Sequence, residues 1–223
     1  MKHRTVRNVM STDVVTVQAD ASAKDIAQLL DSHRIAGVPV VAENRDVVVG
    51  VVTETDLLHK ITYQDETDDW PRLLRRHRVD REKAHGVTAR ELMTTPAVTI
   101  RPDASVVEAA AALERAGVKR LPVVDGVGEL VGIVSRSDLV KVFLRPDQQI
   151  QAEIVEDVLQ QALLLPADAC TVEIAQGVVT LKGHLDRRSD AVLAVALARR
   201  VDGVIRVVDR LGYLNDDTRY VYA

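Results

Sequence analysis

The chain repeats one series of short segments, and this repeat limits its folds more than any other feature. Val9–Met10 recurs 83 residues later as Leu92–Met93, and Gly50–Asp56 recurs 82 residues later as Gly132–Asp138. The other matches, all at an offset of 83, are Val15–Val17 with Val98–Ile100, Ala21–Ser22 with Ala104–Ser105, and Pro39–Val41 with Pro122–Val124. Segments that recur in one order at one spacing indicate a tandem duplication, in which each copy forms the same unit.

Each copy has the pattern of a β-α-β-β-α unit. A short β-rich run, over 14–17 or 98–100, leads into an amphipathic helix predicted over 23–32 or 106–116. Two further β-branched runs follow, and a second helix is predicted from Asp56 or Asp138 onward. Residues 62–86 are a charge-dense insert, predicted as a surface helix and loop.

The chain after Arg145–Pro146 has a different pattern and is predicted to form a separate small domain. Asp147 is the expected N-cap of a strongly amphipathic helix. Two alternating β-runs, 170–175 and 178–184, flank Gln176–Gly177 as a hairpin turn. A helix over about 189–200 and a strand over 204–214 complete an α-β-β-α-β order. The fold class of the whole chain is therefore predicted as α+β.

Composition excludes several classes of function. A net charge of −4 and an aromatic content of 3% disfavour a nucleic-acid partner. The single cysteine, Cys170, can form neither an internal disulfide nor a thiolate metal site. No apolar run has the length of a signal peptide or membrane span, which predicts a cytoplasmic protein. The six histidines are scattered and no nucleophile motif is evident, so neither an enzyme nor a metal site is expected.

The duplicated Thr53-x-x-Asp56 and Ser135-x-x-Asp138 motifs have two interpretations. Either motif alone is typical of a capping box at a helix N-terminus. The same groups also suit a ligand, because a helix N-terminus attracts phosphate and a carboxylate can accept hydrogen bonds from two ribose hydroxyls. The duplication favours ligand binding in at least one copy, and the capping interpretation remains open.

The two copies resemble the CBS domain, the cystathionine β-synthase-type regulatory module. The resemblance is carried by the initial Val/Leu–Met pair, the Pro-Val-Val strand and the ending at Asp56 or Asp138. It implies that repeat 1 (1–61), the insert (62–86) and repeat 2 (87–146) form one pseudo-two-fold module with two clefts. In ligand-binding members these clefts hold AMP, ADP, ATP or S-adenosylmethionine, with Mg²⁺ accompanying ATP. No other cofactor is expected.

The resemblance also implies the binding residues. Asp56 and Asp138 would hold ribose, and Thr53 and Ser135 would lie near phosphate. The other expected pocket residues are Thr16, Val17, Val38, Pro39, Thr99, Ile100, Leu121 and Pro122. Two basic pairs, His33–Arg34 and Lys119–Arg120, match pairs found in nucleotide-sensing members such as the gamma subunit of AMP-activated kinase. Each repeat supplies one pair, enough for one well-charged nucleotide site or two weaker ones.

Residues 147–216 resemble the BON domain, with Gly177, Gly183 and Gly203 at the glycine positions of that family. This resemblance implies phospholipid binding, and hence a peripheral position at the inner membrane face. From Ile150 onward, however, eight basic residues are outnumbered by eleven acidic ones, a net charge of −3. Contact with lipid would depend on a local patch, which consists of Arg187, Arg188, Arg199 and Arg200. Contact with a protein partner is the competing interpretation. Residues 217–223 are assigned to a tail.

Together these features predict a non-catalytic regulatory protein that senses an adenosyl ligand. The CBS pair would bind the ligand and form a homodimer through its helices. The BON domain would contact a partner or a membrane surface. The alternative is a structural or interaction protein whose clefts are vestigial.

Overall fold

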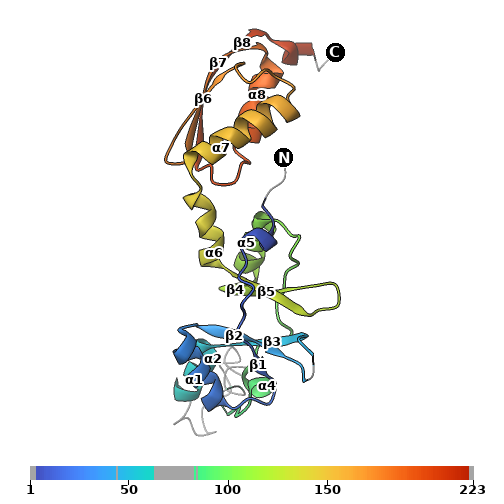
Figure 1. Ribbon diagram of the computed structural model, residues 1–223, viewed down its shortest axis with the longest axis vertical. Helices are drawn as coiled ribbons and strands as arrows, with labels where there is room; N and C mark the ends of the chain where they lie inside the picture. The colour runs from blue at the N-terminus through green and yellow to red at the C-terminus, as the bar shows by residue number, and fades with distance from the viewer. Residues whose placement is uncertain (1–3, 44, 63–82, 84, 221–223) are drawn as a thin grey trace, which may run out of the picture. The chain divides into compact units, whose positions relative to one another are not determined.

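The computed structural model describes residues 4–43, 45–62, 83 and 85–220, so most of the predicted insert lies outside the described residues (Figure 1). The chain divides into two compact units. The N-terminal unit contains residues 9–104 and 111–135. The C-terminal unit contains residues 1–8, 105–110 and 136–223.

The first repeat forms a three-stranded sheet with two helices. Its elements are β1 (Val17–Gln18), α1 (Ala23–His33), β2 (Gly37–Val41), β3 (Val48–Thr53) and α2 (Glu54–Thr62). The strand order is β1-β2-β3, with β1 parallel and β3 antiparallel to β2. The first strand is therefore shorter than the predicted run over 14–17. The helix prediction is confirmed, since α1 begins at the predicted residue and ends one residue later.

The second repeat follows the first from its long helix onward, with the same helix-strand-strand order. It contains α4 (Ala89–Leu92), α5 (Val106–Ala116), β4 (Arg120–Val124) and β5 (Leu130–Ser135). The β4–β5 pair is antiparallel. Its register shifts between Val123 and Val124, and the β2–β3 register shifts at the equivalent place, between Val40 and Val41. The predicted strand over 98–100 is reduced to a single bridge made by Ile100. Shared order and shared irregularity support the duplication inferred from the sequence.

Small β-branched side chains form the core of the N-terminal unit. Val38, Val40 and Val52 are fully buried in β2 and β3, and Ile26 of α1 packs into the same cluster. Burial of each such side chain stabilises the fold by about 1.5–3 kcal/mol. This core fixes the end of β3, and α2 follows β3 without an intervening residue. The duplicated motif at Thr53 therefore sits on a rigid strand-to-helix junction.

The longest segment of the C-terminal unit, 136–223, begins with α6 (Arg136–Val140) and η3 (Lys141–Leu144). Helix α7 (Asp147–Glu153) then continues into a π-helical segment, η4 (Ile154–Ala162). The remaining elements are β6 (Thr171–Ala175), β7 (Val178–Arg187), α8 (Arg188–Ala198), β8 (Arg206–Asn215) and η5 (Asp217–Tyr220). The predicted α-β-β-α-β order is confirmed.

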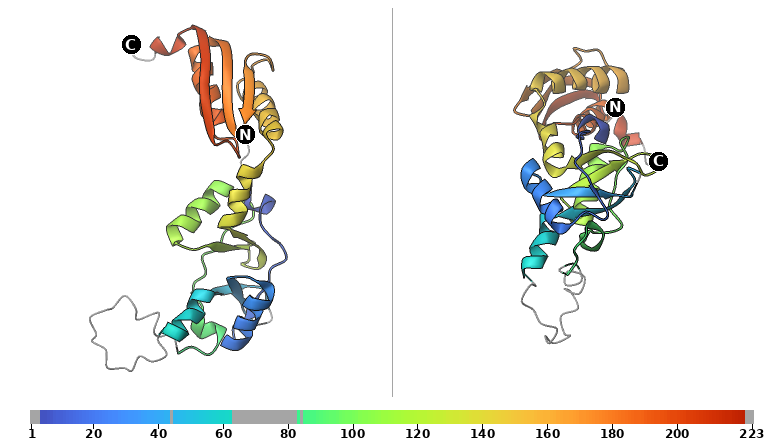
Figure 2. Two further views of the ribbon diagram at one scale, coloured as in Figure 1. Left: turned by 90° about the vertical axis from the view of Figure 1, so that its left-hand side faces the viewer. Right: turned by 60° about the horizontal axis from the view of Figure 1, so that its bottom comes forward.

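The three strands form one sheet in the order β6-β7-β8, with β6–β7 antiparallel and β7–β8 parallel. Helices α7 and α8 lie against one face of this sheet (Figure 2). Ile154, Leu181 and Ala194 are among the most buried residues of the core between them. Cys170 belongs to the same core, where burial raises the pKa of its thiol.

The prediction that Asp147 caps α7 is wrong. Pro146 occupies the N-cap position, and Asp147 is the first helical residue. Its carboxylate instead accepts hydrogen bonds from the backbone N–H groups of Gln176 (2.8 Å) and Gly177 (2.9 Å). Both turn residues have positive φ, 51° and 72°. The predicted hairpin turn is thus confirmed, and Asp147 stabilises it because the carboxylate satisfies two turn N–H groups that the β6–β7 ladder does not use.

Candidate functional site

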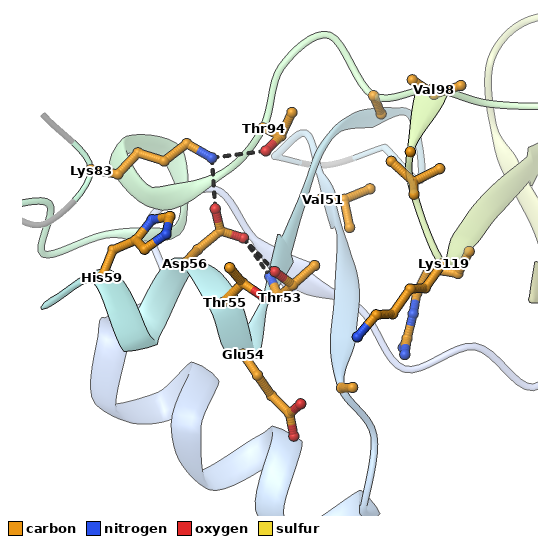
Figure 3. Close-up of a pocket in the computed structure, with 15 residues that line it drawn as sticks. Val51, Thr53, Glu54, Thr55, Asp56, His59, Lys83, Thr94, Val98 and Lys119 are labelled. Carbon is orange, nitrogen blue, oxygen red and sulfur yellow. Dashed lines mark hydrogen bonds and ion pairs between the residues drawn. The ribbon is translucent and has the colours of Figure 1, made fainter. Parts of the chain in front are cut away.

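A pocket of about 350 Å³ lies within the N-terminal unit, between the junction of β3 with α2 and the residues before β4 (Figure 3). Both repeats contribute to it. Its lining residues are Ala36, Val51, Thr53, Glu54, Thr55, Asp56, His59, Lys83, Thr94, Ala97, Val98, Gly117, Val118, Lys119 and Arg120. The volume falls in the range of small-molecule sites.

Asp56 is the buried acid of this pocket, with 6% of its surface exposed. Its Oδ2 atom accepts hydrogen bonds from the Thr53 backbone N–H and from Thr53 Oγ1, both at 2.8 Å. A carboxylate that reaches back to the N–H preceding a helix makes one half of a capping box. The first repeat therefore contains the carboxylate half of the predicted capping box. This role does not exclude ligand binding, because Asp56 also lines the pocket.

Lys83 is the partner of the second carboxylate oxygen. Its Nζ atom lies 2.6 Å from Asp56 Oδ1 and donates a 2.8 Å hydrogen bond to Thr94 Oγ1 (Figure 3). The Lys83 and Asp56 side chains are 13% and 8% exposed. Sequence reasoning missed this residue because Lys83 belongs to the charge-dense insert, where no local signal distinguishes it from its neighbours.

The predicted basic pair Lys119–Arg120 also lines the pocket. Arg120 donates a 2.7 Å hydrogen bond through its guanidinium to the carbonyl of Gly37, its counterpart in the first repeat. Figure 3 shows Lys119 across the pocket from Asp56. Among the described lining residues, the cations Lys83, Lys119 and Arg120 outnumber the anions Glu54 and Asp56. Such a cleft favours an anionic ligand.

Other residues predicted for the first cleft lie elsewhere. His33 ends α1 and Arg34 is its C-cap, with φ at 52°, and both side chains are exposed. Val38 and Pro39 are buried within β2, where their side chains serve the sheet core. Thr16 and Val17 belong to the segment that enters β1, and Val17 is buried. Thus Thr53, Asp56, Lys119 and Arg120 are the predicted residues that this pocket brings together.

The second motif also places its acid in the first turn of a helix. Asp138 is buried in α6, and its Oδ1 atom lies 2.9 Å from Nζ of Lys141, which is 67% exposed. The other residues predicted for this cleft all belong to the N-terminal unit; they are Thr99, Ile100, Leu121, Pro122 and Ser135. Leu121 and Pro122 are buried in β4, and Ser135 ends β5. A second ligand cleft stays a prediction.

The four arginines proposed for lipid contact are not equivalent. Arg188 donates a 2.9 Å hydrogen bond to Asp216 and lies 5.7 Å from the centre of the Tyr213 ring. Arg187, Arg199 and Arg200 are exposed.

The exposed side of α8 is apolar from the start of the helix to Arg199 and Arg200, which follow its last residue. Val192 is 57% exposed and Leu193 is 48% exposed. Helix α8 therefore presents apolar side chains with two arginines at its end.

Asp216 and Asp217 accept hydrogen bonds from Arg188 and Ser189, the first two residues of α8. Hydrogen bonds from Thr218 and Arg188 keep the pKa of Asp216 below its ordinary value. Hydrogen bonds from the Ser189 hydroxyl (2.6 Å) and the Ser189 N–H (3.0 Å) likewise lower the pKa of Asp217.

The part of the chain that the structure describes contains no group of three or more His, Cys, Asp or Glu side chains arranged to hold a metal ion. No described helix is both long and apolar enough to cross a membrane.

The duplicated units, the buried acid at the strand-to-helix junction and the basic pair define a paired-repeat module of the regulatory type. The CBS domain model matches residues 6–63 and 89–145, and the BON domain model matches residues 146–215. The chain therefore belongs to the CBS-domain proteins, with a tandem CBS pair followed by a BON domain. Both resemblances seen in the sequence are confirmed.

Relatives match the CBS pair. An uncharacterized protein of Methanopyrus kandleri is 32% identical over 142 residues, which are 64% of this chain and 64% of that protein. The chloroplastic CBS domain-containing protein CBSX2 of Arabidopsis thaliana is 30% identical over 139 residues, 58% of each chain. This chain thus spans less than two thirds of the length of either relative.

Solved structures agree with the fold. The crystal structure of CBSX2 in complex with AMP has a TM-score of 0.54 at 29% identity, covering 63% of this chain and 96% of that one. The CBS domain pair of protein MJ0100, solved with 5′-methylthioadenosine and S-adenosyl-L-methionine, has a TM-score of 0.51 at 23% identity, covering 64% and 97%. The second likeness concerns the fold alone.

Proposed function

We propose that this protein is a regulatory protein that binds an adenine nucleotide in the pocket at Asp56. The observation that carries the proposal is the convergence of a buried carboxylate, a helix N-terminus and a basic pair on one pocket. The complex of CBSX2 with AMP supports it, because that relative is 29% identical and has the same fold.

Each part of an adenine nucleotide has a matching group in the pocket. Asp56 can accept hydrogen bonds from ribose hydroxyls. Thr53 and Thr55 stand at the N-terminus of α2, where hydroxyl and N–H groups favour phosphate, and Lys119–Arg120 adds positive charge. Apolar side chains that remain for the adenine ring include Val51, Ala97 and Val98. We infer AMP, ADP or ATP as the ligand, with S-adenosylmethionine as the competing adenosyl compound and Mg²⁺ accompanying ATP.

The proposed role is regulatory and not catalytic. Paired CBS domains generally regulate, and the pocket groups assigned above bind a ligand without acting on it. The response would be passed to a protein partner by the BON domain. The exposed Val192 and Leu193 of α8 support such a contact, and the engagement of Arg188 by Asp216 weakens the case for anionic lipid.

A thermal-shift assay of the full chain with AMP, ADP, ATP and S-adenosylmethionine tests the proposal. A ligand that binds the native state raises its stability by about 2.7 kcal/mol at about 100 times Kd. We expect at least one adenine nucleotide to raise the Tm, and the matched guanine nucleotide to leave it unchanged. If no adenosyl compound shifts the Tm at millimolar concentration, the clefts are vestigial and the protein has a structural or interaction role.

A further inference from the structure

The chain already fills most of the hydrogen-bonding capacity of Asp56. A carboxylate offers about four acceptor positions. Oδ2 accepts from Thr53 N–H and Thr53 Oγ1, and Oδ1 accepts from Lys83 Nζ. Ribose held by both vicinal hydroxyls needs two positions, and about one is left. One of the present donors must therefore leave when the ribose binds.

Lys83 is the donor that can leave. The Thr53 N–H is fixed by the end of β3, and the Thr53 hydroxyl sits on a short side chain beside it. Lysine carries its ammonium on a flexible four-carbon stem. The Lys83 ammonium thus uses an acceptor position of Asp56 that a ribose hydroxyl would need.

Displacing Lys83 is unfavourable unless the ammonium finds another anion. Its side chain is 13% exposed and its partner is 8% exposed, so breaking the pair leaves a charge in an enclosed place. The second repeat differs, because the lysine paired with Asp138 is 67% exposed and can turn into water. In the first repeat, His59 occupies the position equivalent to Lys141 of the second repeat. Lys83, which contacts Asp56, is therefore not part of the duplicated pattern.

We propose that Lys83 is a specificity-determining residue, which makes this pocket select phosphate-bearing adenosine over neutral adenosine. When the nucleotide binds, the ribose hydroxyls replace the Lys83 ammonium at Asp56. The ammonium then pairs with the phosphate. A nucleoside displaces the same ammonium and offers it no anion. This inference rests on the proposed function, and it assigns to the lysine of the insert a share of the selectivity beyond that of Lys119–Arg120.

The test is the ratio of two dissociation constants, Kd for adenosine over Kd for AMP, measured by titration calorimetry on the full chain. Lys83→Met removes the competitor and the phosphate partner together. We expect adenosine to bind more tightly, AMP to bind no more tightly, and the ratio to fall by about tenfold. The charge-matched control is Lys24→Met on the exposed side of α1, which should leave the ratio unchanged.

Lys83→Gln keeps an N–H donor but lacks the charge. If Lys83→Met does not fold, the ratio of dissociation constants is measured on Lys83→Gln instead. We expect it to lower the ratio as Lys83→Met does. An unchanged ratio in the folded variants would overturn the inference, as would an equal loss of affinity for both ligands, which indicates a structural role. Failure of the unaltered chain to bind either ligand at millimolar concentration would instead refute the proposed function, and the inference with it.

Discussion

The Lys83 and Asp56 side chains should be strongly coupled in their effects on the stability of the N-terminal unit. The two charged atoms lie 2.6 Å apart, and both side chains are largely shielded from water. Unit charges 4 Å apart attract by about 1 kcal/mol in water and about 4 kcal/mol at an effective dielectric constant of 20. Desolvation opposes part of this attraction. We therefore expect a coupling free energy of about 2 kcal/mol between these side chains.

A double-mutant cycle measures this coupling. Asp56→Asn leaves the Lys83 ammonium without its counter-charge and should lower the free energy of unfolding by about 3 kcal/mol. Lys83→Met should lower it by about 2 kcal/mol, and the double variant should lose less than the sum. The assay is urea unfolding followed by circular dichroism, with the transitions of the two units fitted separately.

The pair of the second repeat, in which only the lysine is exposed, provides the control. The same cycle with Asp138→Asn and Lys141→Met should give a coupling below about 1 kcal/mol, because Lys141 is 67% exposed. A coupling below about 0.5 kcal/mol for Asp56 and Lys83 would refute the reasoning. The lysine would then be a loosely held surface charge and not an internal occupant of the pocket.

Three further predictions concern assembly, surface contact and pH. The CBS pair should form a homodimer through apolar helix positions such as Leu58 and Ile61, which are 56% and 70% exposed. Light scattering at tens of micromolar should give twice the 24.5 kDa chain mass, and a monomer mass would contradict this prediction. The chain should not co-sediment with anionic vesicles at any salt concentration; pelleting that fades with salt and disappears when the four BON arginines are replaced by alanine would establish lipid binding instead. Because the folded-state pKa of Asp217 is lowered, mainly by the Ser189 hydroxyl, its stabilisation is present above the unfolded-state pKa of about 3.9 and is lost as pH falls through the lower folded value. The acid sensitivity of the C-terminal unit, followed by circular dichroism below about pH 4, should therefore be weaker in Asp217→Asn, and equal sensitivity in the two proteins would contradict this assignment.

The duplication and the order of elements could be predicted, because they depend on local periodicity and on spacing, which a single chain displays directly. Both domain families came instead from the resemblance of short motifs to known families. Thr53 and Asp56 could be placed at a helix N-terminus, because a hydroxyl followed three residues later by an acid, before an apolar run, is typical of a capping box. Lys119–Arg120 reached the pocket because it immediately precedes and begins β4.

The errors arose where a distant contact decides the role of a side chain. Asp147 has the pattern of an N-cap, but the hairpin turn 29 residues further along the chain supplies better partners for its carboxylate. Val38 and Pro39 were predicted to line a pocket; both are buried in β2, and their part in a ligand site stays a prediction. Lys83 reaches Asp56 across 27 residues of sequence, and no periodic pattern encodes that contact.

The most direct test of ribonucleotide binding at Asp56 compares AMP with its 2′,3′-dideoxy analogue by titration calorimetry, in the unaltered chain and in Asp56→Ala. Loss of the ribose hydroxyls and loss of the carboxylate should each weaken binding by at least about tenfold, or roughly 1.4 kcal/mol. The two losses should not add, because both remove the same contact. Undiminished AMP binding by an Asp56→Ala protein that circular dichroism shows to be folded would contradict the account.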